Sequence, residues 1–280
     1  MTTRLLAGKT TAVFGVANNH SLAWHVARAW RAAGADVAIG FQERSRKAVT
    51  AMVDGDNMFD ADTRPPLLFA CDVTRDADID DAFARIGAWA PSARLDALLH
   101  AVAAAPTAAL RRERGLVDVT RDEWQSTQDV TAYSLVALAR GALPLMAPAE
   151  GNAGGGGGSI LALSYLGAER VVPAYGVLGP AKAALEAAAL YLAHDVGPLG
   201  VRVNCVSAGP VRTASARALP GFAALAAGAG VAAPLRRNAT ADDVARAAVF
   251  LASDLSSGVT GEVLKVDCGF STMATADAVM

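Results

Sequence analysis

Two tyrosines and a lysine, Tyr165, Tyr175 and Lys182, follow an apolar run in the second half of the chain. If the chain is helical from about Tyr175, the seven-residue step to Lys182 turns through about 700°, so both side chains share one face, about 10 Å apart along the axis. A neutral phenol donates a hydrogen bond to an oxygen that gains negative charge, and a nearby ammonium favours that charge and lowers the pKa of the phenol. The spacing therefore indicates chemistry that passes through an enolate or an alkoxide.

These residues also have a plainer interpretation. A single tyrosine at a strand end usually packs against the core, and a helical lysine usually points into solvent. The presence of all three in one short segment, directly after an apolar run, favours catalysis over packing.

Seven apolar runs alternate with amphipathic segments of helical length. The runs span 10–16, 35–41, 67–73, 95–102, 159–164, 201–207 and 262–266. They are continuously apolar, which is typical of parallel strands buried on both faces. The sequence therefore predicts a doubly wound α/β fold of Rossmann type, with a seven-stranded parallel sheet flanked by helices. Such sheets bind ligands at the carboxyl edge of the strands.

Composition favours one enzyme-sized domain spanning residues 1–280. The chain has 53% hydrophobic and 19% charged residues, enough to bury a large core. Its net charge of −2 comes from interspersed residues, so no nucleic-acid or membrane-binding face is expected. No apolar leader or membrane-spanning run is evident, and we expect a cytoplasmic protein.

Cysteines and histidines give no metal pattern. The cysteines are odd in number and far apart, and we expect buried thiols: Cys71, Cys205 and Cys268. The histidines lack ligand spacing: His20, His25, His100 and His194. The sequence therefore predicts no metal site.

The longest connection, 208–238, follows the sixth strand and contains Pro210, Pro220 and Pro234. A connection of this length at the carboxyl end of a strand is typical of a lid, and we expect it to bind substrate. The polar stretch 54–66 and the glycine-rich stretch 154–158 are expected to be surface loops without chemistry.

The first strand-to-helix turn runs from Gly15 through Asn18 and Ser21. Its single glycine makes it a weak dinucleotide motif, and a turn capped by asparagine or serine is the simpler interpretation. A helix that starts here would nevertheless offer free N–H groups and a positive dipole end to a diphosphate, and Ser21 would add a hydroxyl.

The Tyr-x6-Lys spacing, preceded by Ser-Tyr-Leu-Gly-Ala-Glu-Arg around Tyr165, resembles the bacterial enoyl-acyl-carrier-protein reductases of the NADH type. This family is a divergent branch of the short-chain dehydrogenases and reductases, whose ordinary members carry Tyr-x3-Lys. The first turn is similar to the family's Gly-x5-Ser-x-Ala, and the resemblance covers nearly the whole chain, from Leu6 to about Met273. It implies reduction of a trans-2-enoyl group on acyl carrier protein, the last step of fatty-acid elongation, by a homotetramer.

The resemblance also implies a set of contacts to the nicotinamide cofactor, from Gly15, Ser21, Leu22, Gln42, Asp72, Val73, Val102, Lys182, Val211 and Thr213. The neutral amide of Gln42, where other sites have an acidic residue, favours NADH over NADPH. The basic residues Arg44, Arg46 and Lys47 leave NADPH open. Asp72 has two interpretations, a clamp on the adenine amino group or a helix N-cap.

For substrate, the resemblance implies contacts from Ala104, Tyr165, Tyr175 and Phe222. Tyr175 would stabilise the enolate, Tyr165 would border the thioester, and Lys182 would hold the nicotinamide ribose. Together these three form the catalytic set.

Two departures from the family pattern bear on these expectations. Ala103 and Ala104 stand where the family usually has glycine and an aromatic residue, which predicts a changed substrate range or weaker binding of diphenyl-ether inhibitors. Pro180 replaces the usual leucine, so the helix that carries Lys182 could begin after Tyr175. The alternatives that remain are a carbonyl reductase or alcohol dehydrogenase, a non-catalytic nucleotide-binding protein, and a duplicated reductase of a specialised acyl pathway.

Overall fold

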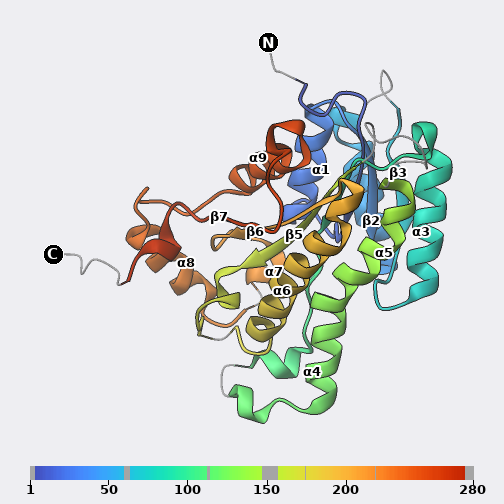
Figure 1. Cartoon of the computed structure of the whole chain (residues 1–280). Helices are drawn as coiled ribbons and strands as arrows, with labels where there is room; N and C mark the ends of the chain where they lie inside the picture. The colour runs from blue at the N-terminus through green and yellow to red at the C-terminus, as the bar shows by residue number, and fades with distance from the viewer. Residues whose placement is uncertain are drawn as a thin grey trace.

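The computed structural model of the protein describes residues 4–59, 64–111, 114–146, 157–173, 175–217 and 219–274. These residues form an α/β fold around a seven-stranded parallel sheet with the order β3-β2-β1-β4-β5-β6-β7 (Figure 1). The strands are β1 Thr10–Phe14, β2 Asp36–Phe41, β3 Leu67–Ala70, β4 Ala97–His100, β5 Ser159–Tyr165, β6 Arg202–Ala208 and β7 Val263–Val266. The seven predicted strands and the predicted fold class are confirmed, with differences only at strand ends.

Helices cover both faces of the sheet. They are α1 Leu22–Ala32, α2 Arg46–Asp54, α3 Asp76–Trp89, α4 Arg121–Gln128, α5 Ser134–Met146, α6 Leu178–Val196, α7 Ala214–Arg217, α8 Phe222–Ala232 and α9 Ala241–Ala252. One core lies under α3, α5 and α6 and the other under α1, α2 and α9. Neighbouring residues of one strand serve different cores: Leu98 belongs to the first and Leu99 to the second. This two-sided burial is why the strands read as continuous apolar runs.

The order of the strands reverses between β1 and β4, which are neighbours in the sheet. A crevice forms where the connections that leave the carboxyl ends of two such strands run to opposite faces of the sheet. The fold therefore places a ligand site beside the residues that follow Phe14 and His100.

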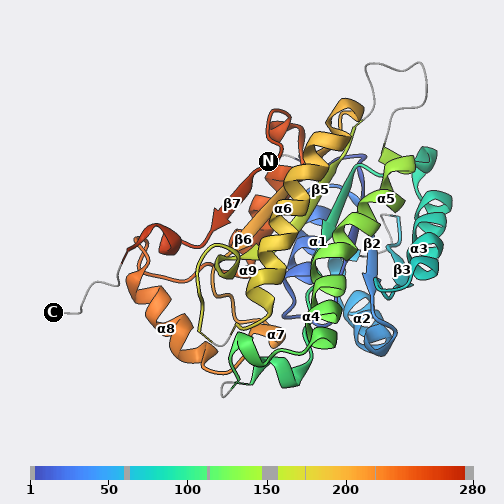
Figure 2. The same ribbon diagram turned by 60° about the horizontal axis from the view of Figure 1, so that its bottom comes forward.

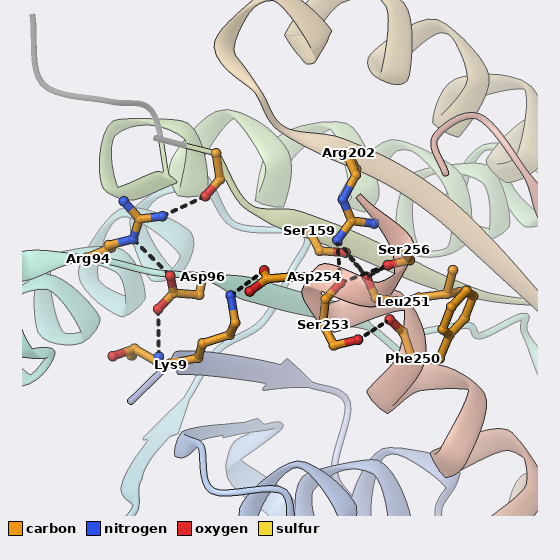
Figure 3. A network of polar contacts seen from close by, with 12 residues as sticks. Lys9, Arg94, Asp96, Ser159, Arg202, Phe250, Leu251, Ser253, Asp254 and Ser256 are labelled. Carbon is orange, nitrogen blue, oxygen red and sulfur yellow. Dashed lines mark hydrogen bonds and ion pairs between the residues drawn. The ribbon is translucent and has the colours of Figure 1, made fainter. Parts of the chain in front are cut away.

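At the opposite edge, the amino ends of the strands are fixed by polar contacts (Figure 3). Both Ser159 Oγ and Arg202 Nη2 donate to the carbonyl oxygen of Leu251, at 2.8 and 2.9 Å. Asp96 accepts from the backbone N–H of Thr10 at 2.8 Å and from Arg94 Nε at 2.8 Å. These bonds satisfy carbonyl groups at the end of α9 and strand ends that would otherwise be buried without partners.

The described residues of the connection 208–238 include two helices, α7 and α8. They lie with α4 at the lower side of the view in Figure 2. Parts of the two expected loops lie outside the described residues, namely 60–63 and 154–156. In the described ranges, no helix has the length and apolar character needed to cross a bilayer.

Candidate active site

A cavity of about 490 Å³ opens at the carboxyl ends of β1, β4, β5 and β6. It brings together most of the predicted site residues: Gly15, Ser21, Leu22, Val102, Ala104, Tyr165, Tyr175, Lys182, Val211, Thr213 and Phe222. Three predicted cofactor residues, Gln42, Asp72 and Val73, do not line this cavity.

The geometry predicted for Tyr175 and Lys182 is wrong. Helix α6 begins at Leu178, so Tyr175 precedes the helix and does not share a helical face with Lys182. Pro180 is the third residue of α6, within the first turn, where its missing N–H costs no helical hydrogen bond. A turn in which Gly176 has φ +54° leads from Tyr175 into the helix. Tertiary packing, and not helical periodicity, therefore brings the phenol and the ammonium to one cavity.

The ring of Tyr175 is 9% exposed and packs against the ring of Tyr165, with centroids 4.9 Å apart at 60°. The ring also lies against Gly167. A Cβ at Gly167 would stand 2.5 Å from Cδ1 and 2.7 Å from Cε1 of Tyr175. Gly167 was not among the predicted site residues, and its only sequence signal is its place in the Ser-Tyr-Leu-Gly motif.

Burial sets the electrostatics of the three central side chains. It raises the pKa of Tyr175 and raises the pKa of Tyr165 to about 12, so both phenols are neutral donors at neutral pH. It lowers the pKa of Lys182 to about 8, and Lys182 Nζ donates to the carbonyl oxygen of Leu163 at 2.6 Å. The expected lowering of the pKa of the phenol is thus wrong, because burial raises the pKa of Tyr175 and the neighbouring Tyr165 and Glu186 raise it further.

A fully buried histidine lies at the end of β4, just before the wall of the cavity. His100 Nε2 and Ser134 Oγ are 2.7 Å apart, and Ser134 Oγ itself donates to the carbonyl oxygen of Val130. The single hydroxyl proton is therefore used, so His100 Nε2 must donate and Nδ1 carries the lone pair. Burial, with a smaller contribution from Lys182, lowers the pKa of His100 to about 3. A neutral imidazole therefore adds no second positive charge beside Lys182.

The N-terminus of α1 also lines the cavity. Ser21 occupies the N-cap position, but its hydroxyl donates back to the carbonyl oxygen of Asn18 at 2.6 Å instead of capping the helix. Asn18 Oδ1 accepts from the backbone N–H of His20. In the described part of the chain, no acceptor meets the backbone N–H of Leu22 or Ala23. These groups and the helix dipole suit an anion.

Gly15 is required at the start of this turn. Its φ is +103°, and a Cβ there would collide with the carbonyl oxygen of Ala101. The absent side chain lets the connections after β1 and β4 approach each other. It also leaves bare backbone in the cavity lining at Gly15, which a ligand can approach closely.

For the residues near the ends of β2 and β3, the expected contacts to a cofactor stay predictions. Gln42 is exposed, and Arg46 of the basic cluster is held by Glu43 through bonds of 2.6 and 2.7 Å. Asp72 accepts from both the backbone N–H and the hydroxyl of Thr74. The N-cap of α3 is Arg75, so the N-cap interpretation of Asp72 is wrong.

The wall beside the cavity mouth is made of small side chains, because Ala103 and Ala104 are both exposed there. Thr131, in the π-helical turn between α4 and α5, donates its hydroxyl to the carbonyl oxygen of Ala104 at 3.3 Å. Phe222, the first residue of α8, also lines the cavity.

Two of the three cysteines, Cys71 and Cys205, are buried thiols as expected, and Cys268 is half-buried. Across the described ranges, no group of three or more histidine, cysteine, aspartate or glutamate side chains could hold a metal ion.

A family model described as "Enoyl-(Acyl carrier protein) reductase" matches residues 15–271. The NADH-dependent enoyl-[acyl-carrier-protein] reductase FabI of Escherichia coli (strain K12) is 39% identical over 269 residues, 96% of each chain. FabI of Bacillus cereus is 41% identical over 267 residues, 95% of this chain and 98% of the relative.

Solved structures give the same result. The reductase of Anaplasma phagocytophilum in complex with NAD matches with a TM-score of 0.87 and 38% identity, covering 98% of both chains. The Bacillus cereus reductase with NADP+ and indole naphthyridinone matches with a TM-score of 0.88 and 40% identity, covering 97% of this chain and 99% of that one.

Proposed function

Because the chain belongs to the enoyl-[acyl-carrier-protein] reductase family, we infer that it reduces trans-2-enoyl groups carried on acyl carrier protein, with NADH as reductant. This is the last step of the fatty-acid elongation cycle. The observation that carries the assignment to this cavity is the convergence of Tyr165, Tyr175 and Lys182 with the uncapped N-terminus of α1 in one space.

The described residues fit a dinucleotide. The N–H groups of Leu22 and Ala23 would take the diphosphate, and the side-chain-free surface at Gly15 would take the flat part of the nucleotide. Lys182 would hold ribose hydroxyls, and Val211 and Thr213 would meet the nicotinamide end. When bound, NADH supplies the hydride that adds to the β-carbon of the enoyl group.

Tyr175 acts on the thioester oxygen. As the β-carbon gains its hydrogen, negative charge moves onto this oxygen, and the neutral phenol donates a hydrogen bond to it. The raised pKa of Tyr175 keeps its proton in place until that charge develops. Protonation of the α-carbon then completes the reduction.

The other residues orient the reactants. Lys182, charged at neutral pH because its pKa of about 8 remains above neutrality, adds positive potential near the developing enolate. Tyr165 borders the thioester and restrains the ring of Tyr175 by contact. Phe222 and Ala104 would flank the acyl chain, and the segment 208–238, with α7 and α8, would act as the lid over it.

Location and assembly are part of the same proposal: a homotetramer in the cytoplasm. In support of assembly, Leu190 and Tyr191 of α6 are 57% and 73% exposed, an apolar surface suited to a second copy.

The test is a spectrophotometric assay at 340 nm with NADH and NADPH in parallel. Crotonyl and longer trans-2-enoyl thioesters of acyl carrier protein and coenzyme A serve as substrates, and the matching 3-oxoacyl thioesters serve as controls. Oxidation of NADH that requires the enoyl thioester is expected. Oxidation with the 3-oxo compounds alone would indicate a carbonyl reductase, and nucleotide binding without any turnover would indicate a non-catalytic protein.

A further inference from the structure

Ser164 and Glu186 form a polar contact beside the cavity. The proposed reaction assigns no role to this contact. Ser164 is 5% exposed, lines the cavity and immediately precedes Tyr165 in β5. Its Oγ donates to Glu186 Oε1 of α6 at 2.5 Å. Glu186 is half-buried, and a buried carboxylate without a partner would be costly. The Ser164 hydroxyl therefore provides the hydrogen bond that this carboxylate needs.

This contact is the second of two adjacent ties between β5 and α6. In the first, Lys182 Nζ donates to the carbonyl oxygen of Leu163 at 2.6 Å. Lys182 and Glu186 are four residues apart, on one face of the helix, and Leu163 and Ser164 are consecutive in the strand. The two ties fix the end of β5 against one helical face, directly before the strand delivers Tyr165 to the cavity.

The carboxylate also has an electrostatic position. Its titratable and charged neighbours come from every element packed around it: Glu169 of the turn after β5, Lys182 of α6, Tyr175 before α6, Cys205 of β6 and Lys265 of β7. Lys265 is already paired with Glu169 at 2.8 Å. Glu186 raises the pKa of Lys182 against the lowering caused by burial, so its negative charge helps to keep the ammonium protonated.

We propose that Glu186 is a positioning residue for enoyl reduction, acting through Ser164 to hold the strand end that presents Tyr165. The inference rests on the proposed function. It assigns Glu186 no contact with substrate or cofactor. If the Ser164–Glu186 hydrogen bond were only structural, its loss would change the stability of the protein alone. If it positions Tyr165, its loss changes turnover and the pH dependence of turnover in a protein that remains folded.

The experiment uses the full chain and four variants, Ser164→Ala, Ser164→Thr, Glu186→Gln and the double Ser164→Ala/Glu186→Gln. Asp195→Asn is the matched control, because it removes an exposed carboxylate from the same helix. For each, kcat and KM for an enoyl thioester, the dissociation constant for NADH, the Tm and the pH profile of kcat/KM are measured.

Ser164→Ala and Glu186→Gln are expected to lower kcat by about tenfold or more, since small displacements of reacting groups have effects of this size. The Tm values of both variants should stay within a few degrees of wild type. Ser164→Thr should retain the wild-type kcat, because threonine keeps the hydroxyl. The double variant should lose no more than the worse single variant, because both changes remove one contact. In Glu186→Gln, the alkaline limb of the pH profile should move to lower pH, because Lys182 loses a stabilising negative charge.

Wild-type kcat and an unmoved pH profile in folded variants would overturn the proposal, as would losses in kcat that simply add in the double variant. Absence of enoyl reduction by the wild-type protein would instead overturn the proposed function itself. The two failures are therefore distinguishable.

Discussion

Replacing Gly167 with alanine tests the placement of Tyr175 with a single methyl group. The backbone at Gly167 is outside the left-handed region, so alanine is compatible with its φ, and the perturbation is confined to the added Cβ. That atom would stand 2.5 Å from Cδ1 and 2.7 Å from Cε1 of the Tyr175 ring. Carbon atoms pack at roughly 3.5 Å or more, so the ring must move by about 1 Å.

The ring has little room to move, because Tyr175 is buried and packs against the ring of Tyr165. A shift of about 1 Å in a catalytic donor lowers the rate by about 10²-fold, equivalent to about 2.7 kcal/mol in the activation free energy. Overpacking should also lower the free energy of unfolding by about 1–3 kcal/mol. The affinity for NADH should change little, since Gly167 does not line the cavity.

The assay measures kcat and KM for a trans-2-enoyl thioester at 340 nm, NADH binding by fluorescence, and unfolding in urea. Gly197→Ala is the matched control, because no atom lies within 4 Å of a Cβ built at that glycine. A folded Gly167→Ala protein with kcat within twofold of wild type would refute the reasoning, since Tyr175 would then be free to shift without consequence.

Three further predictions concern the site and the fold. Tyr175→Phe should lower kcat by about 10²-fold at unchanged NADH affinity, as measured by steady-state kinetics and fluorescence titration, and an unchanged kcat would remove Tyr175 from the oxyanion role. The pKa of Lys182, about 8, is below its ordinary value, so the free enzyme loses this proton as pH rises through 8. The dissociation constant for NADH should then rise by up to about tenfold per pH unit above pH 8, and a flat titration curve to pH 10 would contradict a role for the ammonium in binding. Ser159→Ala removes the hydrogen bond to the carbonyl oxygen of Leu251 and should lower the free energy of unfolding, measured in urea, by about 1 kcal/mol. Ser257→Ala, at an exposed position, is the control and should not lower it. Equal losses in the two variants would show that the hydrogen bond of Ser159 does not stabilise the fold.

Much of the fold could be predicted because its signals are local. Seven apolar runs separated by helical segments specify parallel strands with crossovers, and the reversal of strand order then places ligands at the carboxyl edge. The three chemical side chains were recognisable by type and by their nearness in sequence to the end of β5. Gly15 was recognisable as well, because a glycine after the first strand is a known signal of close backbone approach.

Other features of the site depend on which segments pack together in the folded chain. The late start of α6 removed the shared helical face assumed for Tyr175 and Lys182, although Pro180 had signalled that possibility. Gln42 and Asp72 do not line the cavity, and they follow β2 and β3, which lie beyond β1 on the side away from β4. The apolar runs predict the strands but not the order of the strands in the sheet.

The sequence by itself determined the layered α/β fold, the family and the identity of the reactive groups, because periodicity, motifs and residue type are properties of neighbouring residues. Only the tertiary structure decided that Gly167 supports the ring of Tyr175, that Glu186 holds Ser164, and that burial raises the pKa of a phenol expected to be acidified. Each of these depends on contact or desolvation between segments that the chain order separates. These contacts and this loss of solvation arise only when the packed core brings those segments together.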